Sequence, residues 1–124
     1  MVTGHGVDLI EVERIRGAVN RFGERFLRRA FSPSEMAEAG RHRDSSQFYA
    51  SRFAAKEAFS KAVGTGFVGF GLRDVIVVRS DGGAPRFEFS EKLSRNHPGL
   101  RPEHFLLSLS HVRDVAFASV IRVG

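Results

Sequence analysis

Residues 52–66 of this chain read RFAAKEAFSKAVGTG, and the stretch predicts a helix with charge on two of its stripes. Glu57 and Lys61 are four positions apart and share one face, whereas Arg52 and Lys56 share a neighbouring stripe. The closing Gly-Thr-Gly ends the helix, because glycine adopts the left-handed geometry of a helix C-terminus at little cost. Such a helix is either a solvated surface or one wall of a site for a phosphorylated ligand.

The residues around this stretch predict helices mainly in the first half of the chain and strands mainly in the second. A serine, a proline and Glu35 form a capping box that begins a short helix at residue 33. A turn at 81–83 joins two strands into a hairpin. The expected strands are 2–10, 75–78, 86–89, 104–111 and 115–123, and the expected helices are 11–22, one or two turns within 23–31, 33–39, 46–63 and 90–95.

This order of elements favours an α+β fold, with an antiparallel sheet packed against a long helix and shorter helices. We expect one domain over residues 1–124, because a chain of 124 residues is long enough for a single core. The first strand is mostly apolar and is predicted to be buried. Hydrophobic residues make up 42% and charged residues 27%, a composition typical of globular proteins rather than disordered ones.

Composition also narrows the class of function. The chain has no cysteine, which excludes disulfides, thiolate catalysis and zinc–thiolate sites. It has no apolar run of about 18 residues and no signal-peptide layout at its start, so we expect a cytoplasmic protein without a membrane partner. The net charge of +5 favours an anionic partner, which can be nucleic acid, a phosphorylated cofactor, anionic lipid or an acidic protein.

Two residues outside the opening stretch have side chains suited to chemistry. Asp8 lies among apolar residues of the first strand, where a carboxylate is costly unless it caps a helix, is paired or binds a cation. His111 ends a strand and shares a face with two leucines, a place where histidine is more often structural than catalytic. Asp8 and Glu57 together suit Mg²⁺, which takes few protein oxygens and fills its shell with water and phosphate. Lys56, Lys61 and the glycine loop could supply charge and N–H groups to that phosphate.

Three parts of the chain resemble a known family. They are Gly4-x-Gly6-x-Asp8 followed by Arg14-Ile15, the block 52–66, and Ser-Leu-Ser-His at 108–111. In this order and spacing they resemble the signature regions of the holo-acyl carrier protein synthases, the small 4′-phosphopantetheinyl transferases. The resemblance covers essentially the whole chain and implies the phosphopantetheinyl transferase fold. It also implies transfer of 4′-phosphopantetheine from coenzyme A to a serine of apo-acyl carrier protein, with adenosine 3′,5′-bisphosphate as the other product.

The resemblance implies roles for individual residues, always as numbered in this chain. By similarity, Asp8 and Glu57 bind Mg²⁺, with Mn²⁺ as the alternative cation, and Lys61 contacts the diphosphate of coenzyme A. His111 matches a histidine that contacts coenzyme A phosphate, and Arg52 a basic residue near the 3′-phosphate. The residues Gly64, Thr65 and Gly66 match a loop beside the nucleotide. The proton of the attacking serine can pass to Glu57 or to a water on the metal, and of these two we favour the water.

The family docks its acidic carrier on a basic first helix, and its members commonly form homotrimers with sites at subunit junctions. By resemblance, Arg14 and Arg21 are expected to attract the carrier, and Phe22 or Phe26 to pack against it. The carrier can be one of fatty-acid or of polyketide synthesis. Two other interpretations stay open: a nucleic-acid-binding domain, favoured by interleaved Phe and Arg, and a transferase-like domain of a larger synthase. The first leaves Asp8 and the block 52–66 without a role.

Overall fold

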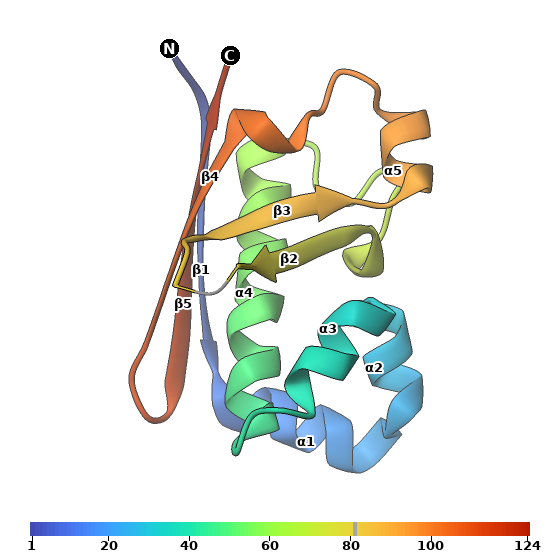
Figure 1. Cartoon of the computed structure of the whole chain (residues 1–124), viewed down its shortest axis with the longest axis vertical. Helices are drawn as coiled ribbons and strands as arrows, with labels where there is room; N and C mark the ends of the chain where they lie inside the picture. The colour runs from blue at the N-terminus through green and yellow to red at the C-terminus, as the bar shows by residue number, and fades with distance from the viewer. Residues whose placement is uncertain (81) are drawn as a thin grey trace.

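A computed structural model describes residues 1–80 and 82–124 and has an α+β fold built around one long helix (Figure 1). Every predicted helix and strand is present to within one residue of its predicted bounds, and two 3₁₀ turns were not predicted. The predicted turn at 81–83 includes Asp81, which lies outside the described residues. The elements are β1 (Val2–Glu11), α1 (Val12–Phe22), α2 (Glu24–Ala30), α3 (Pro33–Ala39), α4 (Ser45–Val63), η1 (Leu72–Asp74), β2 (Val75–Arg79), β3 (Pro85–Phe89), α5 (Glu91–Asn96), η2 (Pro102–His104), β4 (Phe105–His111) and β5 (Val115–Val123).

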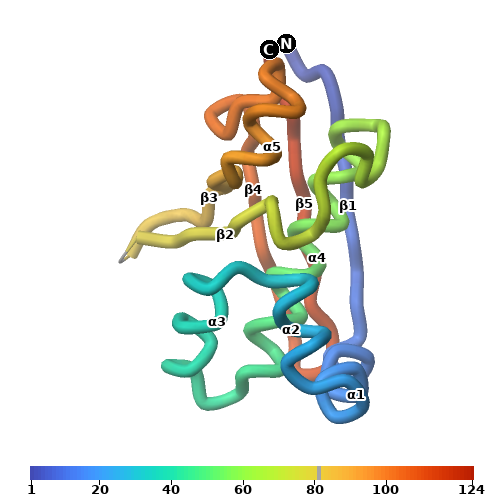
Figure 2. The backbone as a smooth tube through the Cα atoms, turned by 90° about the vertical axis from the view of Figure 1, so that its right-hand side faces the viewer, coloured from blue at the N-terminus to red at the C-terminus, as the bar shows by residue number. Residues whose placement is uncertain are grey.

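The strands form a three-stranded antiparallel sheet, in the order β1-β5-β4, and a separate hairpin of β2 and β3. Helix α4 packs along one face of the three-stranded sheet, with the hairpin and the short helices beyond it (Figures 1 and 2). Among the described residues, no helix or strand covers the other face (Figure 1). The two chain ends lie side by side, where the Gly124 N–H donates to the Met1 carbonyl at 3.2 Å.

The strand β1 packs closely against α4 because two of its residues have no side chain. A Cβ atom at Gly6 would collide with the carbonyl oxygen of Ala58, and one at Gly4 with that of Ala62. Residues on this face of β1 therefore touch the helix backbone, and Asp8 is the next residue on the same face. The two glycines of the sequence motif thus have a packing role in this structure.

The prediction that β1 is buried was wrong for one of its faces. Val7 is 41% exposed and Leu9 is 66% exposed, both on the face that no described element covers. The apolar sequence of β1 therefore does not mean that both faces of this strand are buried. Leu106 on the opposite edge strand is 59% exposed on the same side of the sheet, so this open face has exposed apolar side chains at both of its edges.

Helix α4 is the centre of the core rather than a solvated surface. Twelve of its 19 residues are buried, and five of the twelve are alanines. Phe59 packs edge-on against Phe70 and Phe87 and lies 4.7 Å from the ring of Phe105, which ties α4 to the hairpin side of the molecule. Asp44 caps its first turn and Gly64 ends it in the left-handed conformation, with φ of 92°. No helix in the described part of the chain is long and apolar enough for a membrane crossing.

Candidate active site

Asp8, Glu57 and Lys61 come together where β1 lies alongside the C-terminal half of α4. The Lys61 ammonium donates to Asp8 Oδ1 at 3.3 Å and to the Val7 carbonyl at 2.9 Å. The Asp8 side chain is 18% exposed and that of Lys61 is 55% exposed, so the group is open to solvent. The close approach at Gly6 brings this part of β1 within reach of the helix side chains. The structure therefore brings together three residues that the family resemblance assigns to one site.

Asp8 lies close enough to Glu57 for its negative charge to act on the Glu57 carboxyl group. Burial raises the pKa of Glu57, the negative charge of Asp8 raises it further, and the positive charge of Lys61 opposes both. Two carboxylates that repel each other gain from a cation between them. The geometry therefore suits a positively charged ligand better than two free acids.

The carboxylates of Asp8 and Glu57 suit Mg²⁺ better than they suit a metal whose ligands all come from protein. Among the described residues, no cluster of three or more His, Cys, Asp or Glu side chains has the geometry of a metal site. Zinc sites need at least three protein ligands, whereas Mg²⁺ is commonly held by one or two carboxylates and completes its shell with water and phosphate oxygens. Asp8 and Glu57 are thus a suitable pair for Mg²⁺ together with a phosphate-bearing substrate.

Arg52 lies on a different side of α4, in a pocket of about 560 Å³. It is 8% exposed, and its guanidinium stacks 4.0 Å above the Phe48 ring while donating to Ser51 Oγ at 3.0 Å. Its Nε is buried without a hydrogen-bond partner in the described part of the chain. Burial lowers the pKa of Arg52, and the charge of Arg79 acts in the same direction. The pocket lining includes five basic side chains, which are His42, Arg43, Arg52, Arg79 and His111.

His111 opens into the same pocket from the end of β4. Its Nδ1 lies 3.0 Å from Gln47 Nε2, which also donates to the Val112 carbonyl at 3.3 Å. An amide nitrogen can only donate, so Nδ1 accepts and the ring carries its proton on Nε2. Two acids, Glu38 and Asp44, also line the pocket but leave it with a basic surplus. This pocket is suited to an anionic group such as a phosphate.

Within one chain, this pocket and the acid pair are separate. Arg52 and Glu57 are five positions apart on α4, so their side chains point about 140° apart around the helix. Asp8 pairs with Ala118, and Ala118 pairs with Leu109, which puts strand β5 between Asp8 and the strand of His111. Two strand spacings amount to about 10 Å. The predicted site residues therefore form two groups at opposite edges of the sheet.

The glycine loop lies beyond the end of α4, on the far side of the acid pair from the pocket. Thr65 follows Glu57 by eight residues, which is about 12 Å along a helix axis. The Thr65 hydroxyl donates to the Gly66 carbonyl at 3.3 Å, and Gly66 has a φ of 71°. Gly64, Thr65 and Gly66 thus continue the line of Glu57 and Lys61 without contacting either carboxylate directly.

Lys56 is the one member of the opening stretch whose predicted place was wrong. It is fully buried, with its ammonium 2.7 Å from Glu35 Oε1 and 3.0 Å from the Leu72 carbonyl. It cannot supply charge to a phosphate, because that ammonium is enclosed by protein. The sequence pattern missed this because Glu35 lies 21 positions away.

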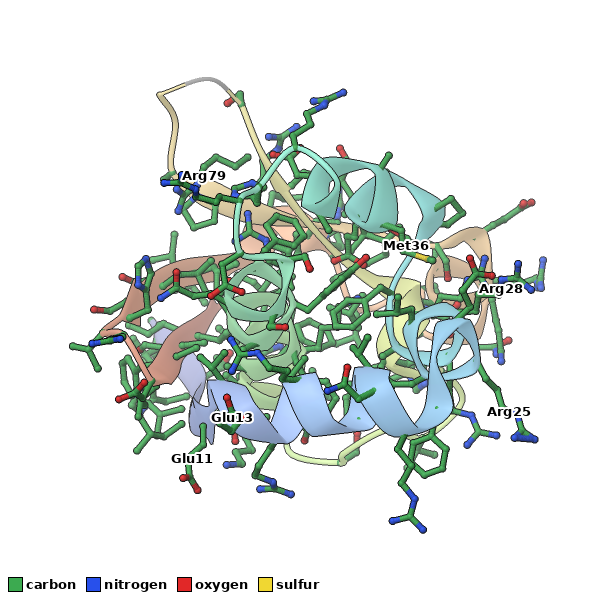
Figure 3. All side chains as sticks on the ribbon, turned by 90° about the horizontal axis from the view of Figure 1, so that it is seen from below. Glu11, Glu13, Arg25, Arg28, Met36 and Arg79 are labelled. Atoms are coloured by element: carbon green, nitrogen blue, oxygen red, sulfur yellow. The ribbon has the colours of Figure 1, made fainter. Side chains whose placement is uncertain are left out.

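The residues expected to meet a partner lie on α1 and α2. Arg14 and Arg21 are exposed, and the Arg21 guanidinium lies 5.2 Å from the ring centre of Phe22, which is 50% exposed. Phe26 instead packs against the core, 6.1 Å from Phe31 and 6.3 Å from Phe53 between ring centres. Seen from below, Arg25 and Arg28 project away from the body of the molecule (Figure 3).

Of the residues that line the basic pocket, only Arg52 and His111 were predicted from the sequence, and the two with the clearest roles among those missed are Arg79 and Gln47. Arg79 ends β2 and comes to the pocket from the hairpin side, and Gln47 orients His111 from the first turn of α4. An arginine at a strand end and a glutamine near a helix start carry no local signal for a site. Only the packing of the hairpin and of β4 beside α4 brings them together.

Comparison with known proteins places the chain in one family. The model of the 4′-phosphopantetheinyl transferase superfamily matches residues 4–118. The chain is 41% identical over 122 residues to the holo-[acyl-carrier-protein] synthase of Koribacter versatilis, covering 98% of both chains. It is 44% identical over 124 residues to the enzyme of that name from Desulforudis audaxviator, covering 100% of this chain and 95% of the other.

Solved structures agree with this. The holo-[acyl-carrier-protein] synthase of Neisseria meningitidis superposes with a TM-score of 0.89 at 33% identity, covering 100% of both chains. The Bacillus anthracis enzyme, solved in complex with CoA (3′,5′-ADP), superposes with a TM-score of 0.79 at 34% identity over 98% of this chain and 96% of the other. The chain is a member of the 4′-phosphopantetheinyl transferase superfamily and, within it, of the holo-[acyl-carrier-protein] synthases.

Proposed function

We propose that this chain transfers 4′-phosphopantetheine from coenzyme A to a serine hydroxyl of apo-acyl carrier protein, releasing adenosine 3′,5′-bisphosphate, with Mg²⁺ as the required cation. The observation that carries the proposal is the cluster of Asp8, Glu57 and Lys61, together with a separate basic pocket on another side of α4. Similarity to the Bacillus anthracis enzyme, solved with coenzyme A, supports the donor substrate. We place the reaction in the cytoplasm.

Asp8 and Glu57 would hold the cation, which when bound supplies positive charge to the diphosphate. With the cation bound, the charge of Asp8 would be compensated without the Lys61 ammonium. Lys61 would then be free to bind a phosphate oxygen. Catalysis in such a site comes from positioning and from stabilising charge that develops on the phosphoryl and leaving oxygens. The half-exposed position of Lys61 supports this role, because a substrate can reach it without unfolding of the chain.

The basic pocket is suited to the other end of coenzyme A, with Arg52, Arg79 and His111 as ligands for phosphate. Because one chain keeps this pocket apart from the acid pair, we propose that two copies complete one site within a homotrimer. The open face of the three-stranded sheet, with Val7, Leu9 and Leu106 exposed, supplies an apolar surface for that assembly.

Subunit mixing tests the shared site. Asp8→Asn and His111→Ala are each expected to be inactive alone. After exchange of subunits, a mixed oligomer has some junctions with both wild-type halves and recovers part of the activity. The oligomeric state and the exchange itself are followed by light scattering and native mass spectrometry. Verified exchange without any recovery of activity would contradict the shared site.

The acidic carrier is proposed to dock on α1 and the first turn of α2. Arg14, Arg21 and Arg25 are exposed, and within the described residues no acid lies within 4.0 Å of them, so their charge is available to a partner. Phe22 is half exposed and can contact a partner, whereas Phe26 packs against the core. The KM for the carrier should rise steeply with salt while that for coenzyme A changes less. A carrier KM that is independent of salt contradicts electrostatic docking.

The proposal as a whole is tested by intact mass. Apo-carrier is incubated with the protein, coenzyme A and Mg²⁺, using carriers of fatty-acid and of polyketide synthesis in parallel. A mass gain of one phosphopantetheine, lost with EDTA and in Asp8→Ala, is the expected result. No gain on any carrier, or a gain that EDTA does not affect, would contradict the proposed reaction or its metal.

A further inference from the structure

The buried pair of Glu35 and Lys56 has no role in the proposed chemistry, yet it joins four parts of the fold. Glu35 is 2% exposed and Lys56 0% exposed. Glu35 Oε1 accepts from the Lys56 ammonium at 2.7 Å and from the Ser32 N–H at 2.8 Å, and Oε2 accepts from the Val77 N–H at 2.9 Å. The ammonium also donates to the Leu72 carbonyl at 3.0 Å and lies 5.1 Å from the ring centre of Phe31.

Stability alone does not explain such a pair. Removing two charges from water is costly, and replacing a buried ion pair by apolar residues of similar volume is often neutral or stabilising. An ion pair can instead fix how the elements it joins are oriented, because its hydrogen bonds form only at defined distances and angles. The contacts of this pair hold α4 relative to α3, β2 and the segment that leads into β2.

The side of α4 that faces β1 has polar contacts from the Lys61 ammonium to Asp8 and to the Val7 carbonyl, but that ammonium is on a half-exposed side chain. There the helix lies on Gly4 and Gly6 of β1, and its buried side chains at this level are mainly alanines, including Ala58 and Ala62. Small residues let the two backbones approach closely, but alanine and glycine side chains form no hydrogen bonds that would hold the helix at one rotation. On the hairpin side Phe59 also resists rotation through its edge-on ring contacts, and the Glu35–Lys56 pair adds hydrogen bonds to this packing.

Lys56 and Glu57 are neighbours in sequence, about 100° apart around α4. We propose that the Glu35–Lys56 pair is a positioning device that sets the rotation of α4, so that Glu57 faces Asp8. Neither residue touches the substrate. Both act through Glu57, and the inference rests on the proposed function of Asp8 and Glu57 as a metal-binding pair.

The test replaces the pair as a unit, Glu35→Gln with Lys56→Met, since removing one partner alone leaves an unpaired buried charge. Binding of Mn²⁺, as a probe of the acid pair, is measured by electron paramagnetic resonance, alongside the melting temperature and kcat/KM for transfer. We expect a folded protein whose Mn²⁺ affinity falls at least about fivefold and whose kcat/KM falls at least about tenfold, since a 1.4 kcal/mol loss is a factor of ten.

Leu93→Ala serves as the matched control. Leu93 is fully buried on α5, which packs on β3 and η1, so this variant loses stability without removing a hydrogen bond of the Glu35–Lys56 pair. Its Mn²⁺ affinity should equal that of the wild type below its melting temperature. If the double variant also keeps wild-type Mn²⁺ affinity and kcat/KM, the positioning role is wrong and the pair is only structural.

A second variant keeps the test decisive if the double variant does not fold. Lys56→Arg retains the positive charge but changes the length and geometry of the contact with Glu35. We expect Mn²⁺ affinity between those of the wild type and a Glu57→Gln reference, and unchanged affinity overturns the inference. Failure of the wild type itself to bind Mn²⁺ or transfer phosphopantetheine would instead contradict the proposed function.

Discussion

Helix α4 carries two lysines five positions apart, and each is bound to an acid from another element. Lys56 is fully buried with Glu35, whereas Lys61 is half-exposed with Asp8 at 3.3 Å. The first pair has its hydrogen bonds supplied by protein, and the second remains open to solvent and to a ligand. The same two residue types thus serve structure in one place and form a candidate site in the other, and burial decides which.

The largest expected effect is on transfer activity, which should depend strongly on the Asp8–Lys61 pair. Asp8→Asn should lower kcat/KM for transfer about ten-thousandfold, or roughly 5 kcal/mol, because the cation would lose a ligand. Its free energy of unfolding should change by no more than about 1 kcal/mol, since exposed ion pairs contribute little. The measurements are an intact-mass time course and urea denaturation. Glu88→Gln, with the same charge change in the exposed pair with Arg86, is the control that should keep full activity.

The next largest effect is on the free energy of unfolding, which should depend more on the Glu35–Lys56 pair than on the Asp8–Lys61 pair. Lys56→Ala should lower the free energy of unfolding by about 3–5 kcal/mol, because it leaves the Glu35 carboxylate buried without its partner. Lys61→Ala should lower it by less than about 1 kcal/mol. Urea denaturation followed by circular dichroism compares the two variants. Equal losses in both would remove the distinction drawn between a structural and a functional pair.

A smaller effect tests how the Asp8 pair is assembled. Gly6→Ala should cost about 1–3 kcal/mol of stability, because its Cβ would lie 2.8 Å from the Ala62 nitrogen and against the Ala58 carbonyl. Moving β1 away from α4 should also weaken transfer. Gly17→Ala on α1 meets no atom within 4 Å and should raise stability by about 0.5–1 kcal/mol. A Gly6→Ala protein as stable and active as the wild type would contradict the close-packing role.

The smallest effect concerns the charge of Glu57 in the metal-free protein. Its pKa is raised by burial and by Asp8, so Asp8→Asn should lower it and Lys61→Met should raise it further. An acid with a raised pKa binds protons more tightly when folded. Its contribution to stability therefore falls as pH rises from the ordinary carboxyl range through the raised value. Carbon-13 NMR of the Glu57 carboxyl measures the shift, and the same pKa in all three proteins would show that the charges do not interact.

Much of the fold was predictable because its signals are local. The capping box of Ser32 and Glu35 was predicted from four residues, and in the structure Ser32 accepts from the Glu35 N–H at 3.2 Å. The site was predictable in part, since Asp8 and Glu57 were named from residue type and resemblance and do lie together. Lys56 was misplaced and Arg79 missed, because their surroundings come from elements distant in sequence.

The sequence by itself determined the helices, strands and caps, because periodicity and backbone hydrogen bonding act within a few residues. It also determined which residues can carry charge, bind a cation or reach a phosphate. Only the tertiary structure decided that Lys56 is enclosed and Lys61 is available, and that Arg52 and Glu57 face different sides of one helix. The physical reason is that desolvation depends on everything packed around a side chain, and most of those atoms come from distant parts of the chain.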